Sequence, residues 1–134
     1  WNIEIVLDWI YKLKLLGIKT ISLSDTIGIS EPNQIKKILN AVNSEYKEIE
    51  FGAHFHSMSS DCYDKIKSAY SSGCFRFDGT IMGYGGCPMA SNELIGNIPT
   101  EKLINFFKKK ENNLKLNILD FENAIDNFKT LIKL

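Results

Sequence analysis

Hydrophobic residues recur every three or four positions from Ile3 to Leu16, the spacing that places side chains on one face of an α-helix. Gly17 follows directly, at the position where a glycine commonly ends a helix. The pattern therefore predicts an amphipathic helix over residues 3–16. Its apolar face consists of Ile3, Val6, Leu7, Ile10, Leu13 and Leu16.

Strand and helix patterns alternate in the residues that follow. Runs rich in β-branched and aromatic residues predict strands over 19–23, 49–56 and 74–81. Ser30 or Glu31 is expected to cap a helix that has Pro32 in its first turn, and another helix is predicted over about 61–72. Beyond the third strand, we expect a helix capped by Thr100, with Leu103, Ile104 and Phe107 as its apolar face, and a last helix over about 119–131.

This order of elements implies a parallel sheet with right-handed crossovers, in either a doubly wound sheet or a TIM barrel. Three parallel strands cannot close a barrel, and a TIM barrel of ~250 residues is about twice as long as this chain. We therefore predict that residues 1–134 are the C-terminal portion of one α/β (β/α)8 TIM-barrel domain. They would supply its last three strands, with closing helices over about 100–134. The start at Trp1, without a methionine, favours this interpretation.

Composition excludes several classes of function. The chain has 134 residues with 16 basic and 16 acidic side chains, and its zero net charge offers no basic surface for nucleic acid. No uninterrupted apolar stretch reaches the ~18 to 20 residues of a membrane span, so we expect no membrane partner. The three cysteines are odd in number and lack the Cys-x-x-Cys spacing of a zinc site, which favours a reducing compartment over a disulfide framework.

The histidines His54 and His56 are the candidate metal ligands. Alternating side chains on a strand point to opposite faces, so these two point to the same side, about 7 Å apart along the strand. They lie at the C-terminal end of a predicted strand, where TIM-barrel enzymes carry their catalytic groups. Packing histidines are the alternative interpretation. A hard cation such as Mg²⁺ or Mn²⁺ would also require oxygen ligands.

Three further residues are candidates with open alternatives. Asp25 ends the first strand, where it would orient a histidine, polarise a substrate, extend the metal shell or simply cap a turn. Cys87 lies in a glycine-rich loop and is the thiol placed to react, whereas Cys62 and Cys74 fall in helix and strand patterns and are expected to be packed. Asn97 would supply an oxygen ligand or serve as a turn residue.

Five motifs in order resemble the hydroxymethylglutaryl-CoA lyase family. The histidine pair alone is shared with related Claisen-type synthases on TIM barrels, whereas the Gly-Gly-Cys-Pro loop followed by Gly-Asn and Thr-Glu singles out the lyases. The motifs are Ser22-Leu23-Ser24-Asp25-Thr26-Ile27-Gly28, His54-Phe55-His56, Phe77-Asp78-Gly79, Gly83-Tyr84-Gly85-Gly86-Cys87-Pro88 and Gly96-Asn97-Ile98-Pro99-Thr100-Glu101.

The resemblance implies cleavage of 3-hydroxy-3-methylglutaryl-CoA to acetyl-CoA and acetoacetate. It implies that His54, His56 and Asn97 bind a divalent cation, Mg²⁺ or Mn²⁺, and that Asp25 is an active-site aspartate. It further implies that Cys87 is catalytic and that Cys87 or a histidine, His54, protonates the enolate product. Two departures from the family pattern are Ser57, where many members have aspartate, and a longer segment between Cys87 and Asn97.

The resemblance also sets expectations about partners and alternatives. The substrate would be a CoA thioester, and the full-length protein is expected to be a homodimer in the bacterial cytoplasm or, in a eukaryote, the mitochondrial matrix. A metal-binding aspartate and an essential arginine of the family come from a first strand that this chain lacks, so the isolated chain is expected to need the N-terminal half of the barrel and to be inactive alone. The alternatives are another acyl-CoA lyase or synthase of the superfamily and a non-catalytic half-barrel.

Overall fold

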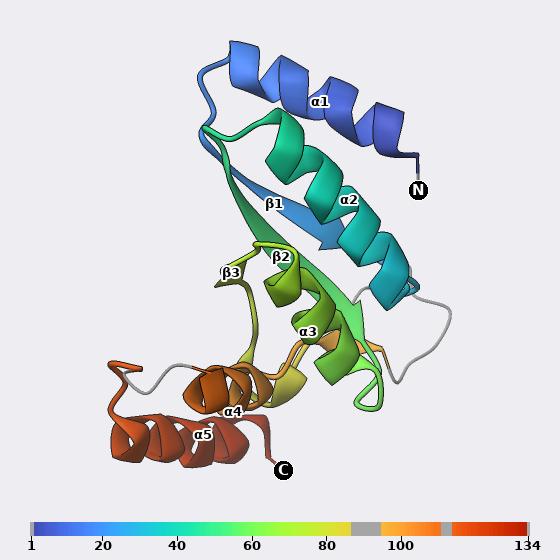
Figure 1. The fold of residues 1–134 in the computed structure, drawn as a ribbon. Helices are drawn as coiled ribbons and strands as arrows, with labels where there is room; N and C mark the ends of the chain where they lie inside the picture. The colour runs from blue at the N-terminus through green and yellow to red at the C-terminus, as the bar shows by residue number, and fades with distance from the viewer. Residues whose placement is uncertain (1, 87–94, 111–113, 134) are drawn as a thin grey trace.

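The computed structural model describes residues 2–86, 95–110 and 114–133, in which helices and strands alternate as expected (Figure 1). The first six elements are α1 (Ile3–Leu15), β1 (Thr20–Asp25), α2 (Pro32–Glu45), β2 (Glu50–Ser57), α3 (Cys62–Ser71) and β3 (Arg76–Phe77). They are followed by a short 3₁₀ helix η1 (Ile81–Gly83), then β4 (Gly96–Asn97), α4 (Thr100–Lys110) and α5 (Ile118–Ile132).

The strands β1, β2 and β3 form a parallel sheet in that spatial order. The pairing of β1 with β2 runs from Thr20 opposite Glu50 to Asp25 opposite Phe55, so the two strands end at the same edge. Gly17 and Gly73 precede β1 and β3 with φ angles of +82° and +83°, as expected for glycines that end helices. The predicted parallel alternation is confirmed.

The third strand is shorter than the predicted range of 74–81. Only Arg76 and Phe77 pair with β2, although the Asp78 N–H still donates to the Ala53 carbonyl at 3.1 Å. Beyond that point the chain leaves the sheet, because the Thr80 N–H bonds the Ile98 carbonyl at 3.0 Å and η1 begins. The backbone of Thr80 therefore bonds to the segment around the start of α4 and not to β2.

The strand β4 was not predicted from the sequence. It pairs antiparallel with the end of β2, placing Asn97 opposite His56 and Gly96 opposite Ser57. A two-residue strand is too short to produce an alternating hydrophobic pattern. Its consequence is that the loop residue Asn97 lies beside the histidine strand.

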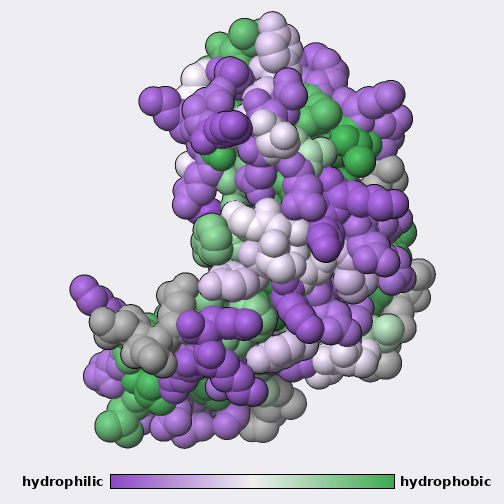
Figure 2. Space-filling view, in the orientation of Figure 1, coloured by the Kyte–Doolittle hydropathy of each residue, from purple (hydrophilic) through white to green (hydrophobic). Residues whose placement is uncertain are grey.

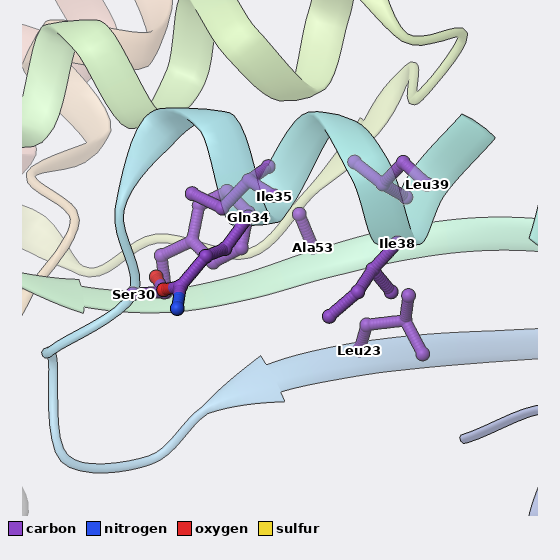
Figure 3. Close-up of a pocket in the computed structure, with 8 residues that line it drawn as sticks. Leu23, Ser30, Gln34, Ile35, Ile38, Leu39 and Ala53 are labelled. Atoms are coloured by element: carbon purple, nitrogen blue, oxygen red, sulfur yellow. The ribbon is translucent and has the colours of Figure 1, made fainter. Parts of the chain in front are cut away.

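The core lies between the sheet and the helices α2 and α3, which run side by side over it (Figure 1). The predicted apolar stripe of α2 is buried, and Figure 3 shows Ile38 of this helix directed toward Leu23 of β1. A cavity of about 20 Å³ remains beneath α2, enough for about one water molecule. Its lining is mostly aliphatic and aromatic, so it is a packing gap in the core. The buried residues of α2 are Ile35, Ile38, Leu39 and Val42.

The last two helices lie beyond α3 at the lower end of the molecule (Figure 1). The Phe106 ring of α4 packs edge-on against Tyr63 and Tyr70 of α3, at centroid distances of 5.5 and 5.3 Å. Leu103 is buried as expected and Phe107 is partly buried, with its ring 5.7 Å from that of Tyr70, whereas Phe106 is a buried residue that the predicted stripe did not include. Tyr84 beside η1 contacts Phe128 of α5 at 5.2 Å.

Hydrophilic residues cover most of the face in Figure 2, and hydrophobic ones show in separate groups, among them one at the top, where Figure 1 places the carboxyl end of α1, and one at the lower left, where it places α5. Leu15 and Leu16 at the carboxyl end of α1 are exposed, whereas Ile10 of the same helix is buried. Within the described residues, none of the helices has the length and apolar character needed to cross a bilayer.

Candidate active site

The two candidate histidines lie on one face of β2 at its carboxyl end. The ring centroids of His54 and His56 are 5.1 Å apart, with the ring planes at 72°. His56 is buried, with 7% of its surface exposed, whereas 39% of the His54 side chain is exposed. The pair therefore presents one fixed ring and one ring accessible to a ligand.

The ring of His56 is oriented by the end of the neighbouring strand. Its Nδ1 atom lies 3.0 Å from the backbone carbonyl oxygen of Asp25. A carbonyl oxygen only accepts hydrogen bonds, so Nδ1 carries the proton in this contact and Nε2 of the neutral ring keeps its lone pair. Histidines that bind metal ions commonly have this arrangement, in which a backbone carbonyl fixes the tautomer of the imidazole ring.

Asn97 is brought beside His56 by the pairing of β4 with β2. Its side-chain Nδ2 donates to the Tyr84 carbonyl at 3.2 Å, and its backbone N–H donates to the Gly85 carbonyl at 3.1 Å. The donor end of the amide is thus engaged, and the amide oxygen is the atom suited to a cation. The backbone of Asn97 comes close to Gly83, and only a glycine allows this: a Cβ on residue 83 would lie 2.8 Å from the Asn97 carbonyl oxygen, and the φ angle of Gly83 is +66°.

Asp25 is fully buried, with 0% of its surface exposed, and its carboxylate faces the turn that follows β1. It accepts hydrogen bonds from the Ile29 N–H, the Ser30 N–H and hydroxyl, and Lys65 Nζ, the last at 2.9 Å. Burial raises the pKa of the Asp25 carboxyl, but the hydrogen bonds from Ser30 and Lys65 outweigh that effect and hold the pKa below its ordinary value. This carboxylate caps a turn and pairs with a lysine, and the residue meets the histidine pair through its main chain.

Asp78 is a further site residue that was not selected from the sequence. Its carboxylate lies 3.5 Å from Nδ1 of His54 and accepts a hydrogen bond from the Ser22 hydroxyl at 3.3 Å. About 41% of its side chain is exposed. The available signal was its position directly after the third strand, in the motif Phe77-Asp78-Gly79, which matches the position of Asp25 at the end of the first.

The candidate thiol Cys87 lies outside the described residues. Cys62 and Cys74 are free and buried, as predicted, and burial raises the pKa of both thiols, that of Cys74 to about 11. Both are therefore protonated and packed at neutral pH.

The donor set near β2 is incomplete as a metal centre. Among the residues that the structure describes, no three His, Cys, Asp or Glu side chains gather closely enough to hold a metal ion. Two imidazoles and one amide oxygen suit a divalent cation, but a hard cation takes further oxygen ligands. A cavity of about 180 Å³ has space for a small ligand, and Asn97 lines it whereas His54 and His56 do not. It is lined by Ser57, Met58, Ser59, Met82, Gly83, Gly96, Asn97 and Pro99.

Comparison with known sequences finds lyases that act on CoA thioesters. The profile of the HMGL-like family matches residues 2–127. The hydroxymethylglutaryl-CoA lyase of Bacillus subtilis is 32% identical over 102 residues, which are 76% of this chain and 33% of that protein. The (R)-citramalyl-CoA lyase of Chloroflexus aurantiacus is 29% identical over 92 residues, 69% of this chain and 29% of that protein. The chain thus spans about a third of the length of these curated relatives.

Solved structures show the same similarity. The HMG-CoA lyase of Bacillus subtilis superposes with a TM-score of 0.89 at 26% identity, covering 99% of this chain and 44% of that one. An Acinetobacter HMG-CoA lyase, solved in complex with coenzyme A and 3-methylmalate, has a TM-score of 0.81 at 29% identity and covers 96% of this chain and 42% of that one. The predicted fold class is confirmed: the sheet and helices form part of an α/β TIM barrel. Mammalian relatives include mitochondrial and cytoplasmic lyases.

Proposed function

Because the chain belongs to the HMGL-like family, we propose that it carries part of the active site of a divalent-metal-dependent lyase. The proposed reaction is the cleavage of 3-hydroxy-3-methylglutaryl-CoA to acetyl-CoA and acetoacetate. The observation that carries this proposal is the histidine pair at the carboxyl end of β2. The two ring centroids are 5.1 Å apart, and the His56 ring is oriented by its hydrogen bond to the Asp25 carbonyl. A relative solved with coenzyme A supports a CoA thioester as the substrate.

The residues present fit part of a site for Mg²⁺ or Mn²⁺. His56 would bind through Nε2, His54 through its accessible ring, and Asn97 through its amide oxygen. A bound divalent cation supplies Lewis acidity toward the hydroxyl and carbonyl oxygens of the substrate. The remaining oxygen ligands would come from other strands of the barrel, which is also why we propose that the isolated chain is inactive. The complete protein is proposed to act as a homodimer.

The reaction requires two proton transfers. The 3-hydroxyl loses its proton, the bond between carbons 2 and 3 breaks, and the electron pair moves into the thioester as an enolate. A proton is then added at carbon 2 of the enolate to give acetyl-CoA. We assign these transfers to Cys87 and His54, the latter with Asp78 beside its ring. Asp25 contributes to the site indirectly, because its backbone carbonyl orients the ring of His56.

A second candidate substrate is supported by the comparisons. The (R)-citramalyl-CoA lyase of Chloroflexus aurantiacus matches nearly as much of this chain as the hydroxymethylglutaryl-CoA lyases do. Citramalyl-CoA carries the same arrangement of hydroxyl group and scissile bond. The two proposals therefore share residues and mechanism, and they differ in the acyl group that the site accepts.

The test is a cleavage assay on the complete native protein with both thioesters in parallel, with Mg²⁺, with Mn²⁺ and after chelation. We expect acetoacetate from 3-hydroxy-3-methylglutaryl-CoA only when a divalent cation is present. Pyruvate formation from citramalyl-CoA alone would favour the second candidate. Cleavage of neither thioester would refute both and would support a non-catalytic half-barrel.

Site variants separate binding from chemistry. His56→Ala is expected to abolish metal-dependent turnover and to weaken Mn²⁺ binding, measured by titration calorimetry. Cys87→Ser is expected to leave Mn²⁺ binding unchanged and to slow the chemical step in single-turnover experiments. The matched control is Cys74→Ser, because Cys74 is buried with its Sγ 3.5 Å from the carbonyl of Phe51, near the start of β2 and not at its histidine end, so any effect should appear in stability. Equal turnover for Cys87→Ser and the native protein would contradict the assignment of that thiol.

A further inference from the structure

Lys65 is buried, which is rare for a lysine, because its ammonium group is costly to remove from water without partners. Only 1% of its surface is exposed, and it lies on the inner face of α3 between the buried residues Cys62, Ile66 and Ala69. Its spacing places it on the apolar face of that helix, although a lysine there would ordinarily extend its ammonium group to solvent. Its burial therefore requires an explanation from its contacts.

The ammonium of Lys65 meets three acceptors, each at 2.9 Å. They are the Asp25 carboxylate, the Gly28 carbonyl and the His56 carbonyl. An ammonium has three N–H donors, so all of them have partners here. The Asp61 carboxylate stands further away, at 3.8 Å.

These three acceptors belong to three segments that frame the candidate site. Asp25 ends β1, Gly28 lies in the turn after it, and His56 lies near the end of β2. The turn approaches β2 so closely that a Cβ on Gly28 would stand 3.2 Å from the His56 carbonyl oxygen. One ammonium group thus joins the ends of both strands behind the histidine pair.

The position of His56 then depends on Lys65 by two routes. Lys65 binds the His56 carbonyl directly, which fixes the backbone of that residue. Lys65 also binds the Asp25 carboxylate, and the carbonyl of the same aspartate accepts the hydrogen bond from the His56 ring. Loss of Lys65 would release both constraints and leave the Asp25 charge buried without its cation.

We propose that Lys65 is a positioning residue of the active site, which holds the His56 ring with its Nε2 lone pair directed to the ligand. This inference rests on the proposed metal-binding role of His56. Lys65 touches neither substrate nor cation in this assignment, and it acts only through Asp25 and His56.

The first experiment uses the complete native protein without metal. Long-range ¹H–¹⁵N spectra report which nitrogen of a histidine carries the proton, and we expect the Nδ1–H tautomer for His56. The Nε2–H tautomer in the native protein would overturn the inference, whatever the variants do. This measurement is independent of the proposed function, because it requires neither metal nor substrate.

The second experiment compares Lys65→Met with the double variant Lys65→Met/Asp25→Asn, which removes both members of the buried pair and keeps similar shapes. We expect either folded variant to lose the single His56 tautomer and to bind Mn²⁺ at least tenfold more weakly than the native protein. The matched control is Lys12→Met, because Lys12 pairs with Asp8 at 2.6 Å on the exposed side of α1 and should change neither readout.

The outcomes distinguish the possible failures. A lower melting temperature with native Mn²⁺ affinity and a native His56 spectrum would show a merely structural lysine and overturn the inference. If the single variant does not fold, the double variant decides in the same way. Failure of the native protein to bind Mn²⁺ would refute the proposed function, and the His56 tautomer in the native and variant proteins would still decide the role of Lys65 in orienting the ring.

Discussion

Asp25 and Asp78 are carboxylates at the carboxyl ends of the two strands that flank β2, yet their surroundings are opposite. Asp25 is fully buried, and donors from the following turn and from Lys65 surround its carboxylate. Asp78 remains 41% exposed, with the His54 ring at 3.5 Å. Position at a strand end therefore does not assign a role to a carboxylate; its access to solvent and its partners do.

The difference has an energetic basis. A buried charge is tolerated only when it is paired and hydrogen-bonded, so removing one member of the Asp25–Lys65 pair leaves an uncompensated charge and is strongly destabilising. An exposed pair is screened by water and contributes little to stability. The same exposure leaves Asp78 and His54 accessible to an incoming ligand, which the buried aspartate is not.

The largest expected difference between the two carboxylates is in stability. Asp25→Leu would leave the Lys65 ammonium buried without its counter-charge, and we expect it to lower the free energy of unfolding by about 3–5 kcal/mol. Asp78→Leu should change it by about 0.5 kcal/mol or less, because that side chain is half exposed. Urea unfolding of both variants of the complete native protein, followed by circular dichroism, measures the two values. Similar losses of unfolding free energy in both variants would show that the two carboxylates do not differ in their contribution to stability.

Acid unfolding should depend on the buried carboxylate of Asp25. The pKa of Asp25 in the folded protein is below its ordinary value, which is about 3.9 in an unfolded chain. The stabilisation is therefore fully present above the unfolded pKa and is lost as the pH falls through the folded pKa. We expect stability in Asp25→Asn to vary less with pH below about 4 than in the native protein. Parallel slopes for native protein and Asp25→Asn would contradict the buried pair.

The sequence predicted the fold well where hydrophobic periodicity was long enough to carry information. The alternation of helices with β1 and β2 was correct, and so was the placement of His54 and His56 on one face at a strand end. The third strand was predicted at the right place but too long, and β4 was not predicted, because each of these strands has two residues and depends on hydrogen bonds between distant segments. The proximity of Asn97 to His56 arises from that unpredicted pairing.

The environment of charged residues was the harder part of the site to predict. Lys65 lies on the same helical stripe as the apolar residues Cys62, Ile66 and Ala69, but a lysine at such a position is ordinarily expected to extend to solvent, and the sequence does not show the acceptors that bury it. The two proposed roles for Asp25, turn cap and active-site group, could not be separated by spacing either. Both answers require knowledge of which segments meet in space, which local patterns do not contain.

Activity should reverse the order of importance of the two carboxylates. Asp78→Asn removes the negative charge beside His54 while keeping the shape of the side chain, and we expect kcat/KM for thioester cleavage to fall by about tenfold, with little change in stability. Steady-state kinetics of the complete native protein and the variant, with Mn²⁺ saturating, measure this effect. An unchanged kcat/KM would show that the contact at 3.5 Å is incidental.

The smallest expected effect belongs to Ser22→Ala, which removes the hydroxyl that donates to Asp78 at 3.3 Å. The bond is exposed, so its loss should cost about 0.5 kcal/mol, and the same amount at the transition state corresponds to about a twofold fall in kcat/KM. Combined with Asp78→Asn, it should add nothing, because its only effect on the site is through that carboxylate. An additive loss in the double variant would mean that Ser22 acts independently of Asp78, through a contact of its own with the ligand.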